Sequence, residues 1–248
     1  MLKKKDSWFT VDTAIAPAYE RPSFKSQKIT EILNGESVKV SKKKGGWIFI
    51  TQTDGYKSWV KEFYGNYSDI PFDASHVITE KGELPFGSLV KKDDNKIVCA
   101  NGDHKLISQS INRLNNLQKP KKLLEMARTL IGCPYRWGGR SSLGFDCSGF
   151  VQMLFLGSGV VFPRDSYQQH ALLLDKQIEG SLSMPGDIHF FGRKNEITHV
   201  GLSTGGWGII HCQGFVKEES IFPIAEEKKN KLADIYLSTH STELNFDI

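Results

Sequence analysis

Long apolar runs are missing from this sequence of 248 residues. Its longest apolar stretches fall far short of the ~20 residues that a membrane-spanning helix needs, so we expect no membrane partner. The start, MLKKKDSWFTVD, has basic residues but no apolar segment behind them, which predicts no signal peptide and a cytoplasmic location. A periplasmic or secreted chain from which the signal peptide had been removed would begin in the same way.

Cysteine is also scarce, and the complete set is Cys99, Cys133, Cys147 and Cys212. No two of them have the C-x-x-C spacing of a zinc knuckle, and the length of the chain does not suggest a disulfide framework. Free thiols are typical of a reducing compartment. The net charge is only +4 and no helical segment carries a basic stripe with interleaved aromatics, so we expect no nucleic-acid partner.

The sequence does have enough apolar material for a core, with 39% hydrophobic residues, and its first third is rich in strand formers. Residues 36–63 alternate short strand-like runs with Lys-Gly-Gly and Thr-Asp-Gly turns. Residues 87–108 repeat this order of strands and turns more faintly. We therefore predict two small β-barrels, over residues 1–65 and 66–118.

The pattern changes after residue 118. The apolar residues of KKLLEMARTLIG, residues 121–132, fall on one helical face. A second helical pattern runs from Cys147 to Phe155, and Gly157 and Gly159 are expected to end it. Strand-like runs follow at residues 186–192, 198–204, 207–213 and 233–239. Helices followed by an antiparallel sheet predict an α+β domain over residues 119–248.

Cys147 lies at the start of the second helical pattern, in the stretch FDCSGFVQMLF. Asp146 before it is a good N-cap, which puts Cys147 at the first helical position. The positive end of the helix dipole stabilises a thiolate there, and the thiolate is the nucleophilic form of cysteine. The alternative is a buried structural cysteine, an interpretation that fits Cys99 and Cys133.

A nucleophile needs a base, and two histidines are related by the geometry of a hairpin. In THVGLSTGGWGIIHCQG, a turn at Gly205–Gly206 would place His199 and His211 opposite or nearly opposite each other on one face of the sheet. One imidazole would then orient the other. A two-histidine metal site is the rival, but that face offers no further ligand because Cys212 points the other way, so we expect no metal and no cofactor.

Five blocks in the second half of the chain occur in the order and at the spacing of a known family. They are YRWGGRSSLGFDCSGFVQMLF, FPRDSYQQ, PGDIHFF, THVGLSTG and IIHCQGFV. Over about residues 121–240 the chain resembles the NlpC-type cysteine peptidases of bacterial cell-wall metabolism, which have a papain-like fold. The two N-terminal barrels resemble bacterial SH3-like domains.

The resemblance implies roles for four residues. Cys147 would be the nucleophile, His199 the general base and His211 the residue that orients the base. Tyr135 matches the family tyrosine expected near the oxyanion. Without the family, Tyr135 and Trp137 would be interpreted as core aromatics or as packing around a glycine turn.

Two SH3-like barrels ahead of an NlpC domain resemble the γ-D-glutamyl-L-diamino-acid endopeptidases. These cut the bond between D-Glu and the diamino acid in murein peptides with a free N-terminal L-Ala. The resemblance implies that Asp165 binds the L-Ala ammonium, with Ser166 beside it and Tyr56 closing the pocket. It also places Asp146 and Ser148 among the substrate contacts. By itself, Asp165 would be interpreted as a helix N-cap.

One departure from the subfamily concerns the ammonium site. Where an acid is expected before Pro-Ser, the sequence reads AYERPS, with Arg21 in that place and Glu20 one position earlier. Either Glu20 substitutes for the missing acid, or the site is altered. The sequence leaves the diamino acid open between diaminopimelate and lysine. It also leaves open a catalytically inactive wall-binding protein, or an amidase or acyltransferase of the same fold.

Overall fold

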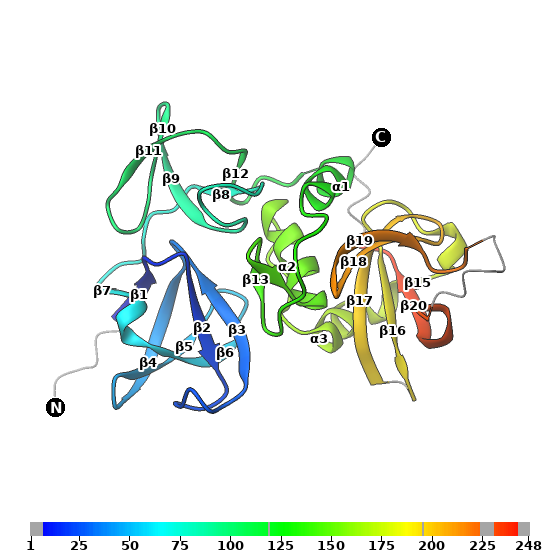
Figure 1. The fold of residues 1–248 in the computed structure, drawn as a ribbon, viewed down its shortest axis with the longest axis horizontal. Helices are drawn as coiled ribbons and strands as arrows, with labels where there is room; N and C mark the ends of the chain where they lie inside the picture. The colour runs from blue at the N-terminus through cyan, green and yellow to red at the C-terminus, as the bar shows by residue number, and fades with distance from the viewer. Residues whose placement is uncertain (1–6, 119, 195, 224–230, 243–248) are drawn as a thin grey trace.

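The computed structural model describes residues 7–118, 120–194, 196–223 and 231–242. Two sheets lie on one side of the molecule, and the helices and a third sheet lie on the other (Figure 1). Helix α2 (Cys147–Gly157) is central, between the strands of the N-terminal half and the third sheet (Figure 1). After residue 118 the order is the expected one, with antiparallel strands following the helices.

The first sheet has seven strands in the order β3-β2-β6-β5-β4-β1-β7, with a short 3-10 turn, η1 (Glu62–Tyr64). Its core follows the period of two expected of half-buried strands, because Ile48 and Ile50 of β5 are fully buried while Phe49 between them is not. The strands are β1 (Ser7–Val11), β2 (Ile15–Tyr19), β3 (Lys28–Leu33), β4 (Ser37–Lys44), β5 (Trp47–Thr51), β6 (Lys57–Lys61) and β7 (Gly65–Ser68).

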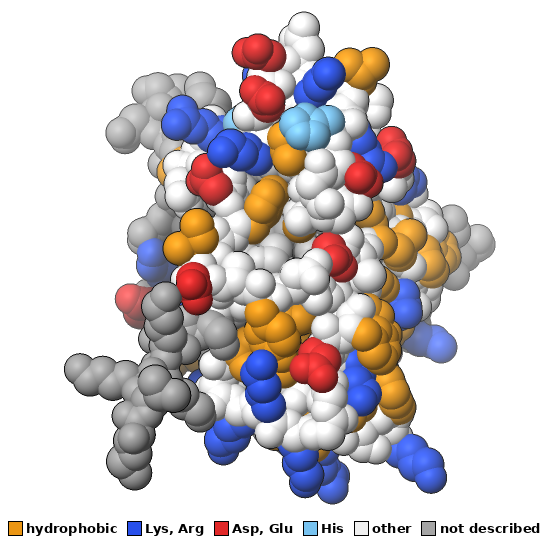
Figure 2. Space-filling view, turned by 90° about the vertical axis from the view of Figure 1, so that its left-hand side faces the viewer, with side chains coloured by type: hydrophobic (Ala, Val, Ile, Leu, Met, Phe, Trp, Pro, Cys, Tyr) orange, Lys and Arg blue, Asp and Glu red, His pale blue; other side chains and the backbone are white. Residues whose placement is uncertain are grey.

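The outer face of the first sheet combines lysines with aromatic rings. Four lysine Nζ atoms lie over rings at 3.6 to 5.7 Å from the ring centres. Figure 2 shows blue side chains around an apolar patch over the lower part of the molecule, where this sheet lies. Such cation–π pairs cover aromatic surface that would otherwise face water.

The second sheet has five short strands in the order β11-β10-β9-β8-β12 around a separate small core that includes Ile78, Val90 and Ile97. Its strands are β8 (His76–Ile78), β9 (Leu89–Asp93), β10 (Lys96–Val98), β11 (His104–Leu106) and β12 (Ile111–Arg113). Among the described residues, no pairing joins the two edge strands of either N-terminal sheet. Closure into two barrels therefore stays a prediction, as do the domain boundaries at residues 65 and 118.

The third part has three α-helices and a six-stranded antiparallel sheet in the order β15-β20-β16-β17-β18-β19, in the residues that are described. The helices are α1 (Pro120–Thr129), α2 and α3 (Ser166–Leu172), with short turns η2 (Leu174–Lys176), η3 (Gly180–Leu182) and η4 (Ala233–Ile235). A separate two-stranded sheet consists of β13 (Arg140–Ser141) and β14 (Gly144–Phe145). The strands of the six-stranded sheet are β15 (Gln177–Ile178), β16 (Ile188–Arg193), β17 (Glu196–Gly205), β18 (Gly208–Gln213), β19 (Phe215–Ser220) and β20 (Tyr236–His240).

Helix α2 begins at Cys147, as predicted, and ends at Gly157, one of the two glycines expected to end it. It is buried on almost every side. Its apolar side chains share one core with the third sheet and with Leu33 of the first sheet. The predicted helix over residues 121–132 ends earlier, at Thr129. None of the described helices is long and apolar enough to cross a membrane.

Polar contacts also join the first sheet to the third part. The backbone N–H of Arg140 donates to Glu31 Oε2 at 3.0 Å, and Arg164 Nε donates to Thr30 Oγ1 at 3.1 Å. Thr30 and Glu31 belong to β3, so this strand lies against the third part. The first sheet thereby contributes to the surroundings of the start of α2.

Candidate active site

Asp146 fixes the start of α2 and, with it, the position of Cys147. Its Oδ1 accepts a hydrogen bond from the N–H of Gly149 at 2.6 Å, which is the N-cap expected from the sequence. Its Oδ2 accepts from the N–H of Gly138 at 2.9 Å. Cys147 is consequently the first helical residue, and its side chain is largely buried.

Arg164, which was not predicted as a site residue, holds this N-cap in place. The side chain is 1% exposed and donates from Nη1 and Nη2 to the two carboxylate oxygens of Asp146, at 3.0 and 2.6 Å. Nη1 also donates to Ser148 Oγ at 3.0 Å. A buried carboxylate needs such a paired cation. The arginine of the PRD block, beside Asp165, was the available clue.

His199 and His211 lie on one face of the β17–β18 hairpin and form a hydrogen bond between Nε2 of His199 and Nδ1 of His211 at 2.7 Å. His211 Nε2 in turn contacts Glu219 Oε1 of β19 at 2.8 Å. The structure thus forms a chain of three polar groups that ends in a carboxylate.

The hairpin register differs from the predicted one. Leu202 lies opposite Ile210 and Gly205 opposite Gly208, so the turn is centred on Gly206–Trp207 and the two histidines are diagonal neighbours. They still share a face because the difference is an even number of residues. A Cβ at Gly201 would lie 2.5 Å from Cδ1 of Ile209 and 2.8 Å from the Cβ of His211, so a glycine there leaves room for both side chains.

Glu219 was missed because β19 was not predicted. A turn at Gly214, where φ is +74°, pairs His211 with Lys217 and places Glu219 two residues further along on the same face. The run Gln-Gly-Phe after His211 was the signal that would have predicted this second hairpin.

Burial decides the protonation of the reactive pair. It raises the pKa of the Cys147 thiol to about 12, and the charge of Asp146 adds to the rise, while N–H groups of Ser148 and Val200 favour the thiolate. Burial also lowers the pKa of His199 to about 3. Burial thus favours a neutral thiol and a neutral imidazole, whereas the helix dipole favours the thiolate.

Glu219, the last group in this series of hydrogen bonds, determines which nitrogen atoms of the two histidines carry protons. The hydrogen bond from His211 lowers the pKa of Glu219 to about 2, so this carboxylate is an acceptor and Nε2 of His211 carries a proton. In the tautomer in which Nδ1 of His211 is the acceptor, Nε2–H of His199 donates to it. The lone pair on Nδ1 of His199 is then available to a thiol.

A cavity of about 450 Å³ opens beside Cys147. The predicted residues that line it are Tyr56, Tyr135, Cys147, Ser148, Asp165 and Ser166, together with Asp146. Trp137 lines it as well and is 58% exposed, so it is not a core aromatic. Gln27 and Ile29 of the first sheet's β2–β3 region complete one side.

Asp165 and Tyr56 meet across the junction between the first sheet and the third part. Tyr56, from the β5–β6 turn, donates its hydroxyl to Asp165 Oδ2 at 3.0 Å. Burial raises the pKa of Asp165, whereas Arg164 and the Tyr56 hydroxyl lower it. Asp165 is also the N-cap residue of α3, so the same residue caps this helix and lines the cavity.

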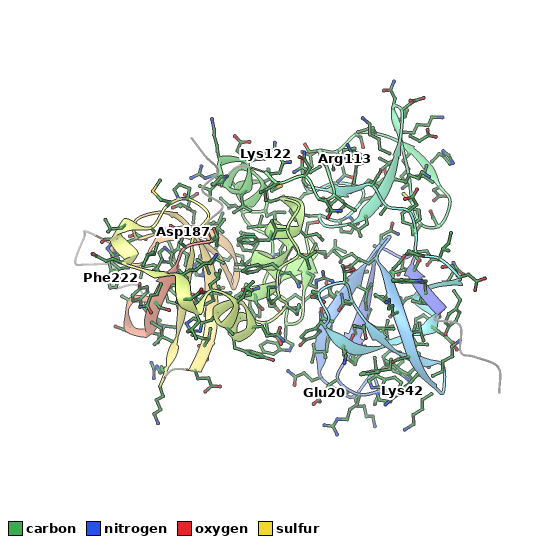
Figure 3. All side chains as sticks on the ribbon, turned by 180° about the vertical axis from the view of Figure 1, so that it is seen from behind. Glu20, Lys42, Arg113, Lys122, Asp187 and Phe222 are labelled. Carbon is green, nitrogen blue, oxygen red and sulfur yellow. The ribbon has the colours of Figure 1, made fainter. Side chains whose placement is uncertain are left out.

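The structure does not bring Glu20 to this cavity. Its carboxylate lies 3.5 Å from Arg21 Nε in the turn after β2, and both side chains are more than half exposed. Figure 3 shows Glu20 at the outer edge of the first sheet. The idea that Glu20 replaces the missing acid therefore has no support from its position. Within the described part of the chain, no group of three or more His, Cys, Asp or Glu residues is arranged to hold a metal ion.

Family models match two segments of the chain. Residues 132–231 match the NlpC/P60 family, and residues 17–65 match the bacterial SH3 domain. The chain carries an NlpC/P60 domain. The segment includes Cys147, His199, His211 and Glu219, and the SH3 segment includes Tyr56.

Similar proteins extend the match beyond the NlpC/P60 domain. A γ-D-glutamyl-L-lysine dipeptidyl-peptidase of Bacillus subtilis (strain 168) is 28% identical over 228 residues, which cover 79% of this chain and 76% of that protein. An enzyme of the same name from Bacillus cereus (strain ATCC 10987 / NRS 248) is 25% identical and covers 79% of this chain and 70% of its own. The NlpC/P60 chain is therefore a hydrolase of the cysteine-peptidase type.

A solved structure gives the same fold over nearly the whole chain. The NlpC/P60 family protein from Bacillus cereus ATCC 10987 superposes with a TM-score of 0.80 at 18% identity, covering 94% of this chain and 99% of that one. The arrangement of the N-terminal sheets ahead of the NlpC/P60 domain is thus shared with a known structure.

Proposed function

We propose that the chain is a cysteine endopeptidase that hydrolyses the bond between γ-D-Glu and the diamino acid in murein peptides with a free N-terminal L-Ala. The observation that carries the proposal is one cavity lined both by Cys147 and by the Asp165 carboxylate, two groups of different chemistry. Val200, the residue after His199, directs its N–H at Cys147. The names of the similar Bacillus enzymes point to the same bond.

The proposed reaction begins with the neutral pair. Nδ1 of His199 takes the thiol proton as the sulfur of Cys147 attacks the γ-amide carbonyl carbon of D-Glu. The negative charge that develops on the oxygen is stabilised by the backbone N–H of Cys147 and the hydroxyl of Tyr135. Burial raises the pKa of that hydroxyl, which keeps it protonated as a donor.

Breakdown of the intermediate needs the same proton. His199 gives it to the leaving amine of the diamino acid, which leaves a thioester on Cys147. Water then attacks the thioester, with His199 as the base, and releases L-Ala-D-Glu. His211 and Glu219 support both steps, since an imidazolium at His199 gains from a neighbouring hydrogen bond that ends in a carboxylate.

Recognition of the substrate amine rests on Asp165. Its carboxylate is partly buried and bonded to Tyr56, and a substrate ammonium would give it a charged partner. Ser166 lines the cavity beside it as a further polar contact. The L-Ala nitrogen of intact peptidoglycan is acylated, so it lacks the charge that this site would bind.

Peptide cleavage followed by mass spectrometry tests the reaction. We expect L-Ala-γ-D-Glu-L-Lys or its diaminopimelate analogue to be cut to L-Ala-D-Glu and the free diamino acid. Cys147→Ala should abolish turnover, whereas Cys99→Ala, in the core of the second sheet, should retain it. Turnover by Cys147→Ala above a few per cent of wild type would exclude the proposed nucleophile.

Acylation of the substrate tests the amine site. N-acetylation of the tripeptide should lower kcat/KM roughly a thousandfold, because a charge-assisted hydrogen bond is lost and a partly buried acid is left without a cation. Asp165→Asn should remove much of this difference by slowing hydrolysis of the free peptide. Equal rates for the free and acetylated peptides in the wild-type enzyme would refute the recognition of the free amine.

A further inference from the structure

Three adjacent strands of the first sheet carry six lysines and no acidic residue. Strands β4, β5 and β6 are neighbours in the sheet, and their sequences are SVKVSKKK, WIFIT and KSWVK. The net charge of the whole chain is only +4, so these strands concentrate positive charge in one region. Figure 2 shows blue side chains around an apolar patch on this side of the molecule. The lysines are Lys39, Lys42, Lys43, Lys44, Lys57 and Lys61.

The register of the strands places aromatic side chains in a row across the outer face of this sheet. Tyr19 of β2 lies opposite Trp59 of β6, and Trp59 lies opposite Phe49 of β5. Lys42 of β4 continues the row beyond Phe49. Paired residues point to the same face of a sheet, and the two neighbours of Phe49 in β5 are fully buried on the other face. The aromatic row therefore faces outward.

Lysines lie on both sides of the aromatic row. Trp47 on one side and Thr51 on the other each lie between two lysines of the neighbouring strands. These lysines are roughly 10 Å apart across the strands and roughly 13 Å apart along them. A small anion can contact one or two of them, whereas a chain with repeated acidic groups can contact all of them. The four lysines are Lys44 and Lys61 beside Trp47, and Lys39 and Lys57 beside Thr51.

The protein itself leaves these charges without acidic partners. In the part of the chain that the structure describes, none of the six lysines forms a salt bridge. Lys42 lies over the ring of Phe49, with its Nζ 5.7 Å from the ring centre. Glu62, the acid that directly follows β6, accepts a hydrogen bond from the hydroxyl of Tyr67 at 3.0 Å. The lysines are thus available to an acidic partner.

Trp59, in the middle of the aromatic row, is only half-buried. Its ring lies 5.1 Å from that of Phe49 at an angle of 45°. Lysines lie over four other rings of this sheet, but none lies over Trp59 among the described residues. Part of an apolar ring is therefore exposed between two rows of cations. A sugar ring has an apolar face of C–H groups that can pack on such a surface.

We propose that this face of the first sheet binds a linear acidic polysaccharide. Its sugar rings would lie along the aromatic row, and its carboxylates would pair with the lysines on both sides. In a β-1,4-linked chain of uronic acids, successive sugars face in opposite directions, so their carboxylates alternate between the two edges of the chain. A single-stranded nucleic acid has its phosphates along one edge and its bases along the other, so it would use only one row of lysines.

Calorimetry with an oligosaccharide of β-1,4-linked mannuronic acid tests the proposal. The probe should bind the wild-type chain, and the affinity should fall as the salt concentration rises, because salt screens exposed charges. An oligosaccharide of β-1,4-linked glucose has the same linkage without the carboxylates and should not bind. The measurement concerns binding alone, so its outcome is independent of the reaction proposed at Cys147.

A set of lysine substitutions locates the binding face. Replacement of three exposed lysines of β4 by glutamine should weaken binding of oligomannuronate roughly tenfold, since each exposed charge pair contributes a small amount. The matched control makes the same change of net charge at three exposed lysines of the second sheet and should leave the affinity unchanged. The variant is Lys39→Gln/Lys42→Gln/Lys44→Gln, and the control is Lys91→Gln/Lys92→Gln/Lys96→Gln.

A substitution of the central ring tests the contact with the sugars. Trp59→Ala should weaken binding up to about tenfold, whereas Phe222→Ala, an exposed aromatic of the third part, should not. If Trp59→Ala does not fold, amide NMR shifts of the wild-type chain should change mainly in β4, β5 and β6 on addition of the probe. The proposal would be overturned by an absence of binding, by equal losses in a variant and its control, or by tighter binding of oligo-dT than of oligomannuronate.

Discussion

The pKa of the Cys147 thiol is raised mainly because the sulfur is shielded from water. Desolvation penalises whichever member of the Cys147 and His199 pair becomes charged, and it acts on both. The helix dipole and two N–H groups act in the opposite direction but do not compensate. On the proposed function, the thiol proton therefore moves to His199 as the sulfur attacks the carbonyl carbon of the substrate.

The first prediction concerns alkylation of this thiol. With the pKa of Cys147 raised to about 12, its modification by iodoacetamide near neutral pH should be slower than that of the same cysteine in the denatured chain. The rate should continue to increase through the alkaline range. Mass spectrometry of the modified peptide measures it, and a rate that levels off below about pH 8 would show a preformed thiolate.

The second prediction uses two neighbouring acids of β19. Glu219 accepts from His211, whereas Glu218 pairs with Arg128 on the surface. Glu219→Gln should lower kcat by about tenfold, because a charged acceptor is replaced by a neutral one, and should change KM little. Glu218→Gln is the matched control and should have wild-type kinetics. Equal effects of the two substitutions would remove Glu219 from the catalytic chain.

At the scale of elements, the start of α2 depends on a residue outside the helix. Arg164 bonds both carboxylate oxygens of Asp146 and reaches Thr30 of the first sheet. The first turn of the helix, the loop before α3 and strand β3 are thereby joined at one guanidinium. Movement of any of the three would displace Cys147.

The third prediction follows from this ion pair. Arg164→Met should lower the free energy of unfolding by about 3–5 kcal/mol, because it leaves the Asp146 carboxylate buried without a cation. Arg128→Met breaks the exposed pair with Glu218 and should cost less than about 1 kcal/mol. Urea denaturation measures both. Similar losses in the two variants would argue against a structural role for the buried pair.

Local patterns predicted those elements that depend on neighbours in the sequence. Helix α2 and its Asp146 cap follow from periodicity and from one capping residue, and the shared face of His199 and His211 follows from the pleat. The register of the β17–β18 hairpin could not be predicted from these local patterns, because a turn at Gly206–Trp207 changes the partner of every residue in the hairpin. Strand β19 was missed because Lys-Glu-Glu-Ser does not alternate clearly between apolar and polar residues.

Contacts between segments that are distant in the sequence could not be predicted from a single sequence. Arg164 and Thr30 are 134 positions apart, and nothing local to either one indicates the other. Tyr56 and Asp165 were linked only through the family resemblance, and the structure brings them within 3.0 Å. Glu20 has the negative charge that an ammonium site needs, but it lies in the exposed turn after β2 and does not reach the cavity.

For the molecule as a whole, buried histidines couple stability to pH. Burial lowers the pKa of His189 to about 4 and that of His199 to about 3, both below the ordinary value of 6.5. The unfolded chain then binds more protons than the folded chain over this range, so the free energy of unfolding decreases as the pH falls from about 6.5 to about 3.

The fourth prediction tests this coupling at His189, which pairs with Gly201 of β17 and has no role in the proposed chemistry. Wild-type protein should lose several kcal/mol of stability over that fall in pH, and His189→Gln should show a shallower dependence. His104→Gln, on an exposed strand of the second sheet, is the control and should keep the wild-type slope. Thermal unfolding across the pH series measures it, and identical slopes in wild type and His189→Gln would contradict the assignment.

Tyr56 comes from the turn between two strands of the first sheet, whereas Asp165 and Cys147 belong to the third part of the molecule, and all three line the same cavity. On the proposed function, Asp165 binds the free amino group while Cys147 attacks the bond after the second residue. The cavity then selects the cleavage site by its separation of two residues from the amino end. Recognition of this kind involves the amino end of the peptide and does not depend on the residues beyond the diamino acid. Fragments of different total length would therefore be shortened at similar rates, each of them once.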